Sequence, residues 1–146
     1  MLGELIGECR GKVTGVRVLS PEGPYARLEV SLQGEGILSG QQVTDFGTYV
    51  QSVRPGGLLQ GDAHNVMISS NGDVADWFGG GVGRPTGPGF KSTYGAYGRF
   101  DSAQGALAPL EAVGTTVEYD VDEDGSYHWR MWEWTGAAVP EAVEAR

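Results

Sequence analysis

Asp45, Asp62, His64 and Tyr49 are the side chains of this sequence best suited to acid–base chemistry. Carboxylates and imidazoles exchange protons in water, and a phenol donates one when it is held against a reacting group. Apolar and indole side chains follow in the same stretch, at Val66, Ile68 and Trp77. Apolar walls with a few convergent polar groups are typical of a small-molecule cavity. We therefore take the first four residues as candidate catalytic groups and the other three as candidate ligand-binding groups.

The first turn in this stretch predicts which side chains share a face of a β-sheet. If Val53 pairs with Leu58 across residues 54–57, Tyr49 lies opposite Asp62. Cross-strand partners point to the same side of a sheet. This register therefore predicts that the phenol and the carboxylate lie side by side.

The second turn extends the same face into the next strand. Asn71-Gly72 between two alternating segments is a strong hairpin signal, because a type I′ turn needs a positive φ at both central positions. Pairing of Ser70 with Asp73 then places Val66 opposite Trp77. Glycines fall opposite His64 on both sides, which predicts room for a ligand above the imidazole.

Both turns together predict two opposite faces. One face gathers Asp45, Tyr49, Asp62, His64, Val66, Ile68 and Trp77. The other gathers Thr44, Phe46, Thr48, Asn65, Met67, Asp76 and Phe78. The same arithmetic on the last hairpin groups Val117, Tyr119, His128, Arg130, Trp132 and Trp134. We expect the first face to border the interior; the alternative is that it points to solvent, and a slip of one residue would exchange the two faces.

An all-β fold must position these residues. Apolar and polar residues alternate with a period of two along the chain, as at Leu28, Val30 and Leu32. Turn residues divide the pattern into about eight strands joined by hairpin-length loops, with no room for crossover helices. Closure removes the unpaired edges of such a meander. We predict a single antiparallel up-and-down β-barrel in residues 1–136 and a tail or short helix in residues 137–146; a β-sandwich is the alternative.

Composition and charge exclude several function classes. The 146 residues include 10 Lys and Arg against 19 Asp and Glu, a formal net charge of −9, which disfavours nucleic acid and anionic membranes as partners. No stretch approaches the ~18 apolar residues of a membrane-spanning helix, and we expect a cytoplasmic protein. The one cysteine, Cys9, allows neither an internal disulfide nor a cysteine-based zinc site. No nucleotide, metalloprotease, serine-hydrolase or paired-cysteine motif is present, so we expect no cofactor and no metal.

The strand pattern resembles the calycin-type barrels and, within them, the allene oxide cyclase-like barrels. The segments that carry the resemblance are residues 40–49 (GQQVTDFGTY), 54–57 (RPGG), 79–83 (GGGVG) and 121–125 (VDEDG), together with Trp132 and Trp134. The resemblance implies the barrel fold. It assigns no catalytic residue, because no catalytic motif of the plant cyclases is recognisable in the sequence.

Three functions fit a barrel of this kind. The first is an isomerase or cyclase that confines a small apolar metabolite and assists with an acid and a base. The second is a non-catalytic barrel that only binds a small molecule, and the third is a structural or interaction protein whose barrel is filled by side chains. Phe46, Met67 and Phe78 are expected on the outer wall, and an apolar patch there predicts a homo-oligomer; the alternative is that the tail from Ala137 covers the patch.

Overall fold

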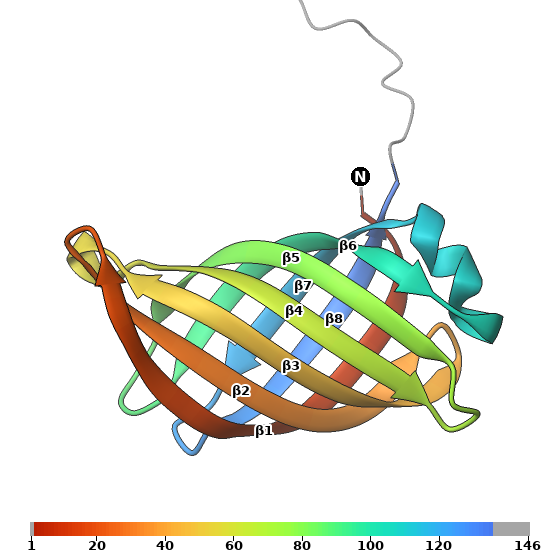
Figure 1. The fold of residues 1–146 in the computed structure, drawn as a ribbon, viewed down its shortest axis with the longest axis horizontal. Coiled ribbons are helices and arrows are strands. Elements are labelled where there is room, and N and C mark those ends of the chain that lie inside the picture. The colour runs from red at the N-terminus through yellow and green to blue at the C-terminus, as the bar shows by residue number, and fades with distance from the viewer. Residues whose placement is uncertain (1, 136–146) are drawn as a thin grey trace, which may run out of the picture.

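The computed structural model describes residues 2–135, which form one closed barrel of eight antiparallel strands. Each strand pairs with the next one in sequence, and the last pairs with the first (Figure 1). The strands are β1 (Leu2–Glu22), β2 (Tyr25–Leu38), β3 (Gln41–Val53), β4 (Leu59–Ser69), β5 (Val74–Pro85), β6 (Ser92–Ala103), β7 (Gly114–Val121) and β8 (Ser126–Trp134). The prediction of an all-β, up-and-down antiparallel barrel is confirmed. The predicted tail or helix in residues 137–146 lies outside the described residues.

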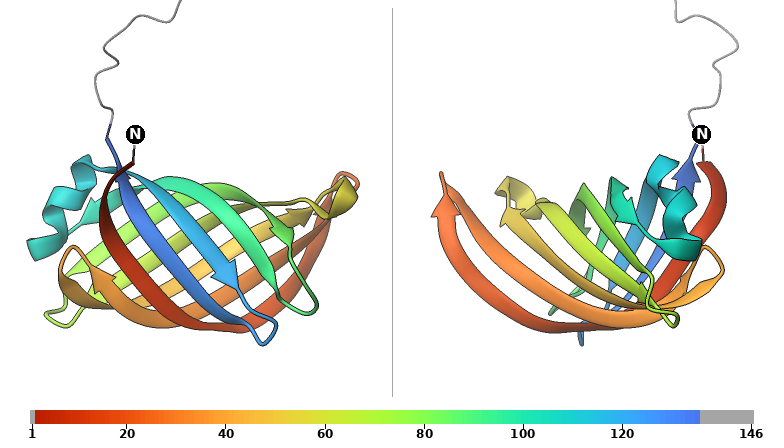
Figure 2. Two further views of the ribbon diagram at one scale, coloured as in Figure 1. Left: turned by 180° about the vertical axis from the view of Figure 1, so that it is seen from behind. Right: turned by 45° about the vertical axis from the view of Figure 1, so that its right-hand side comes forward.

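Two short 3-10 helices interrupt the strand pattern. The first, η1 (Pro55–Gly57), links β3 to β4, and the second, η2 (Gly105–Ala112), links β6 to β7. Leu107 and Leu110 of η2 are buried in the same core cluster as the barrel interior. The helix thus covers one end of the barrel, opposite the end that carries the β1–β2 hairpin (Figure 2). Among the described residues, neither helix is long and apolar enough to cross a membrane.

The turn residues adopt the backbone conformations that their types favour. Ser39 and Gly40 both have positive φ, at 48° and 77°, and they join β2 to β3 as a two-residue turn. Positive φ at both central positions matches the right-handed twist of the paired strands. Gly72 and Gly125 have φ of 85° and 86° and stand at the same place in two three-residue turns. A glycine therefore indicates each of these turns, although the first turn has two residues and the other two have three.

Period-two alternation separates the barrel core from its outer wall. Inward and outward residues alternate along the strands except at β-bulges in β1 and β6, and the core includes Leu32, Val43 and Trp129. Cys9 is 1% exposed within this core, as expected for a small apolar residue. Burial raises the pKa of its thiol.

Candidate functional site

The register of β4 differs by one residue from the prediction. Val53 pairs with Leu59, not with Leu58, because the backbone N–H of Arg54 bonds the Leu58 carbonyl and closes a loop one residue longer. A slip of one residue moves every side chain of a strand to the other face. The predicted inward orientation of the β4 residues Asp62, His64, Val66 and Ile68 is therefore wrong.

A second correction on the other side of β4 cancels the first. The backbone carbonyl of Ser69 accepts a hydrogen bond from the N–H of Gly72, and the N–H of Ser69 donates to the carbonyl of Asp73. The turn therefore holds three residues instead of two. Asn65, not Val66, is therefore the cross-strand partner of Trp77. The two errors compensate, so β3 and β5 have the relative faces that the sequence predicts, and only β4 is reversed. Asp45, Tyr49 and Trp77 point inward as predicted.

His64 belongs to a polar network on the outer wall. Its Nε2 lies 2.9 Å from Oδ1 of Asp76, and its ring stacks on Phe78 with 4.0 Å between ring centroids. Oδ2 of the same aspartate accepts a hydrogen bond from Ser102. The His64 side chain is 46% exposed. Asp62, on the same face of β4, is also exposed, so neither residue borders the interior.

Asn65 and Met67 occupy the inward positions that His64 and Val66 were expected to fill. Met67 is fully buried, so its predicted place in an outer apolar patch is wrong. The remaining outer apolar side chains there include Phe46, Ile68 and Phe78, which are each about two-fifths exposed. The expected space above His64 is likewise absent, because Gly47 now faces Asn65 and a Cβ there would meet its amide.

Asp45 is a fully buried carboxylate that ties three strands together. It accepts hydrogen bonds from Nδ2 of Asn65 at 2.8 Å, the hydroxyl of Tyr127 at 2.9 Å and Nε1 of Trp129 at 2.8 Å. The donors come from β4 and β8, while Asp45 is on β3. Burial raises the pKa of the Asp45 carboxyl, and these hydrogen bonds oppose the shift. Asp45 is not part of the lining of the cavity described below, whereas two of its donors, Asn65 and Trp129, are.

Glycines make room for aromatic side chains inside the barrel. The Trp77 indole lies over Gly79 and Gly98, where any Cβ atom would overlap the ring or the neighbouring backbone. Its Nε1 donates to Oγ1 of Thr115 at 2.8 Å, and this hydroxyl donates to the Gly98 carbonyl. These glycines therefore accommodate a buried tryptophan, and the space that they provide is filled.

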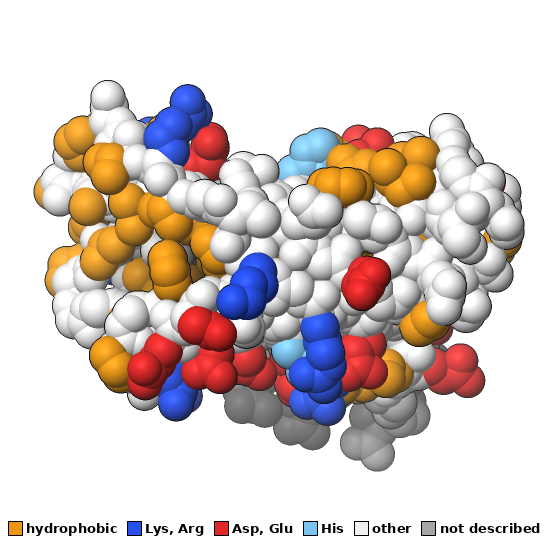
Figure 3. Space-filling view, turned by 90° about the horizontal axis from the view of Figure 1, so that it is seen from below, with side chains coloured by type: hydrophobic (Ala, Val, Ile, Leu, Met, Phe, Trp, Pro, Cys, Tyr) orange, Lys and Arg blue, Asp and Glu red, His pale blue; other side chains and the backbone are white. Residues whose placement is uncertain are grey.

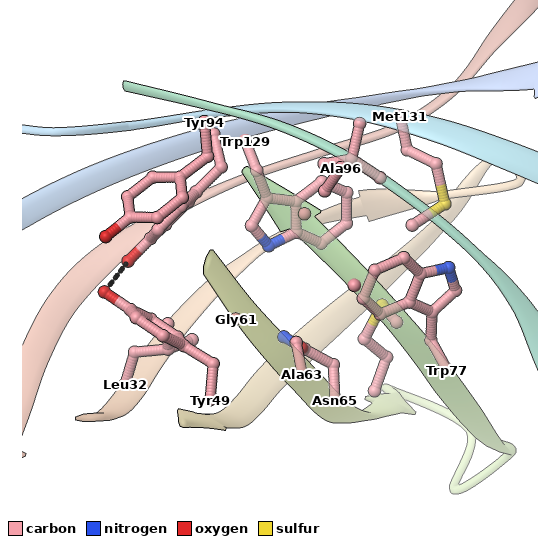
Figure 4. Close-up of a pocket in the computed structure, with 15 residues that line it drawn as sticks. Leu32, Tyr49, Gly61, Ala63, Asn65, Trp77, Tyr94, Ala96, Trp129 and Met131 are labelled. Carbon is pink, nitrogen blue, oxygen red and sulfur yellow. Dashed lines mark hydrogen bonds between the residues drawn. The ribbon is translucent and has the colours of Figure 1, made fainter. Parts of the chain in front are cut away.

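An apolar cavity of about 80 Å³ remains in the barrel interior. Glycines and alanines form part of its wall, and aromatic and sulfur-containing side chains form most of the rest (Figure 4). The lining residues are Leu32, Tyr49, Gly61, Ala63, Asn65, Met67, Trp77, Gly80, Gly81, Tyr94, Ala96, Val117, Tyr119, Trp129 and Met131. Two of the predicted site residues, Tyr49 and Trp77, are among them. Because a cavity of about 150 Å³ can hold benzene, this one suits a smaller molecule or the end of a longer one.

Three tyrosines, Tyr49, Tyr94 and Tyr119, form a polar cluster at the cavity wall. The hydroxyl of Tyr119 donates to that of Tyr49 at 3.2 Å, and Tyr94 donates to Oε1 of Gln51 at 2.6 Å. The rings pack against one another, with centroids 5.4–6.0 Å apart. Burial raises the pKa of all three phenols, so they are neutral hydrogen-bond donors at neutral pH.

Apolar side chains on the inner face are exposed at the end of the barrel that carries the β1–β2 hairpin. Val16 and Val18 pair with Val30 and Leu28 of β2 and share their face, yet they are 44% and 80% exposed. Val53 of β3 is exposed at the same end. Hydrophobic side chains gather around a hollow there (left in Figure 3). We refer to this region, formed by Val16, Val18, Leu28 and Val53, as the open end.

Sequence reasoning missed several cavity residues on β8. In the last hairpin Tyr119 pairs with Trp129, so Tyr127, Trp129 and Met131 point inward, and the predicted grouping of His128, Arg130 and Trp132 with Tyr119 is wrong. The amide of Asp122 bonds the Ser126 carbonyl around three residues that end in Gly125. The Gly at the third turn position, shared with the 70–72 turn, is the signal that could have fixed both registers.

The fold has been observed before in proteins of unknown function. A crystal structure of a conserved protein from Rhodopseudomonas palustris superposes with a TM-score of 0.76 and 14% sequence identity, covering 91% of this chain and 97% of that one. A crystal structure of a protein from Clostridium acetobutylicum ATCC 824 superposes with a TM-score of 0.75 and 10% identity, covering 90% and 98%. No family model and no curated protein matches the sequence. These similarities show the eight-stranded barrel fold, and any proposal about function has to be argued from the site.

Proposed function

We propose that the protein binds a small, largely apolar molecule inside the barrel. The observation that carries the proposal is the apolar cavity of about 80 Å³, walled by small residues and aromatic rings. Burial of apolar ligand surface is favourable by roughly 25 cal/mol per Å². Gly61, Ala63 and Ala96 would have to be larger for side chains to fill the barrel completely.

The open end offers a route by which such a molecule reaches the cavity. Its exposed valines are apolar groups on an inner face, where water contact is unfavourable. The opposite end is covered by Leu107 and Leu110 of η2. Gln51 and Tyr49 pair with Leu28 and Val30 of β2, which puts the tyrosine cluster at the side of the cavity nearer the open end.

Confinement could extend binding to catalysis of an isomerisation or cyclisation. Tyr49 favours this second function, because its phenol borders the cavity and could donate a proton to a confined substrate. Asp45 is not part of the cavity lining, and Asp62 and His64 are exposed on the outer wall. The site thus offers an acid without an accessible carboxylate base, which makes binding the better-supported function.

The proposal is tested by titration with 2-methyl-1-butene, an apolar molecule of five carbon atoms. Indole ¹H–¹⁵N NMR signals of Trp77 and Trp129 should shift on binding, whereas the signal of Trp134, half exposed on the outer wall, should not. Ala63→Leu fills the cavity and should abolish the shifts. Thr48→Leu is the matched control, because this residue is exposed on the outer wall. Equal shifts in the two variants, or none in the natural protein, would contradict the proposal.

A further inference from the structure

Most polar groups at the cavity wall already have partners. The indole N–H groups of Trp77 and Trp129 donate to Thr115 and Asp45, and the Asn65 amide also donates to Asp45. Buried donors that are satisfied by the protein gain little from a ligand. Besides Asn65, which uses one N–H of its amide on Asp45, the tyrosine cluster holds the polar side chains of the lining, with three hydroxyls close together.

One phenolic proton of the tyrosine cluster has no acceptor among the hydrogen bonds of residues 2–135. Its three hydroxyl groups form two hydrogen bonds, one between Tyr119 and Tyr49 and one from Tyr94 to Gln51. One phenolic proton of the first pair is left for another oxygen, whichever of the two hydroxyls donates to the other. The Tyr94 ring packs against that of Tyr49, with 6.0 Å between the ring centroids. An incoming oxygen thus competes with a neighbouring phenol and not with bulk water.

No charged side chain lines this cavity. Among residues 2–135, none of the Lys, Arg, His, Asp or Glu side chains is part of the lining. An anionic group would be buried there without a counter-ion, at a cost far above that of a neutral polar group. The same cavity accepts a neutral oxygen, provided that it finds a donor.

We propose that the cluster of Tyr49, Tyr94 and Tyr119 selects neutral, oxygen-bearing apolar ligands by donating a hydrogen bond to a carbonyl oxygen. This inference rests on the proposed binding function. It names the ligand class as small ketones, aldehydes or esters, or longer molecules that end in such a group. Carboxylates and other anions are excluded from the same position.

Three probes of equal size and different chemistry test the inference. Butanone, 2-methyl-1-butene and propanoate each have five heavy atoms and differ in one group: a carbonyl, a methylene or a carboxylate. Tyr49→Phe removes one hydroxyl and should weaken butanone binding about three- to tenfold, the range expected for one neutral hydrogen bond. The same variant should leave 2-methyl-1-butene binding within about twofold. Propanoate at pH 7 should not displace either probe.

Tyr97→Phe is the matched control. Tyr97 is 67% exposed on the outer wall, so loss of its hydroxyl should leave binding of all probes unchanged. Equal effects of Tyr49→Phe on butanone and 2-methyl-1-butene would overturn the selection of a carbonyl while leaving apolar binding intact. Propanoate binding as tight as that of butanone would also overturn it. Absence of binding by 2-methyl-1-butene would refute the proposed function and this inference together.

Discussion

Removal of the Asp45 carboxylate should destabilise the barrel strongly. Asp45→Ala leaves three buried donors, on Asn65, Tyr127 and Trp129, without their acceptor. Each unsatisfied buried donor costs about 1–3 kcal/mol, so the loss should reach at least about 3 kcal/mol. That is a large fraction of the ~5–15 kcal/mol by which a domain of this size is stable.

Asp45→Asn separates the hydrogen bonds from the charge. The amide oxygen can still accept from Tyr127 and Trp129, and the Asn65 amide can rotate to offer its oxygen to the new N–H₂ group. The ionised carboxylate is itself costly to bury, which offsets part of the loss. We expect Asp45→Asn to cost less than half of the free energy lost in Asp45→Ala.

Urea denaturation monitored by tryptophan fluorescence gives both values from the midpoint and the slope. If the role of Asp45 is structural, the natural protein should be the most stable, Asp45→Asn less stable and Asp45→Ala the least stable. A loss below about 1 kcal/mol in Asp45→Ala would show that the three donors find other partners and would refute the reasoning.

Four further outcomes are expected. The pKa of Asp45 is raised in the folded state, so the folded protein binds this proton more tightly than the unfolded chain does. The free energy of unfolding should therefore fall as pH rises from 3.8 toward the raised pKa. Urea denaturation at several pH values should show this fall in the natural protein and not in Asp45→Asn. Gly98→Ala should lower the free energy of unfolding by about 1–3 kcal/mol, because the new Cβ would overlap the buried Trp77 indole. Gly95→Ala is its control: the new Cβ would meet no atom within 4 Å, so the urea midpoint should stay close to that of the natural protein. His64→Ala should leave 2-methyl-1-butene binding within about twofold in the NMR titration, since its side chain lies outside; a larger effect would contradict the β4 register. Light scattering should show a homo-oligomer that covers the outer apolar side chains, and a monomer across a wide concentration range would count against this.

Local patterning in the sequence predicts the barrel well because each strand alternates and each turn contains its marker residues. The shared face of Asp45 and Tyr49, which lie on one strand, followed from this pattern, whereas the inward orientation of Trp77 was correct only because two register errors cancelled. The orientation of His64 did not follow from the pattern, because it depends on whether a turn holds two residues or three, and Asn71-Gly72 suits both lengths. One residue decides which of two adjacent side chains is buried.

Long-range packing explains why the polar partners of the site were not predictable. Tyr127 and Trp129 reach Asp45 across more than 80 residues of sequence. Gly79 and Gly98 are needed because Trp77 lies flat against them, a contact that no local pattern encodes. The sequence pattern could therefore identify candidate polar and aromatic side chains, but which of them are in contact depends on how the closed barrel brings distant strands together.

Native mass spectrometry of the protein purified from its own host tests ligand binding in the barrel most directly. We expect an added mass above the 15.5 kDa chain that is lost on denaturation, is absent in Ala63→Leu and is retained in Thr48→Leu. The released molecule should be small, largely apolar and uncharged at neutral pH. The bare chain mass in every sample, or an added mass that persists in Ala63→Leu, would contradict a ligand in the barrel interior.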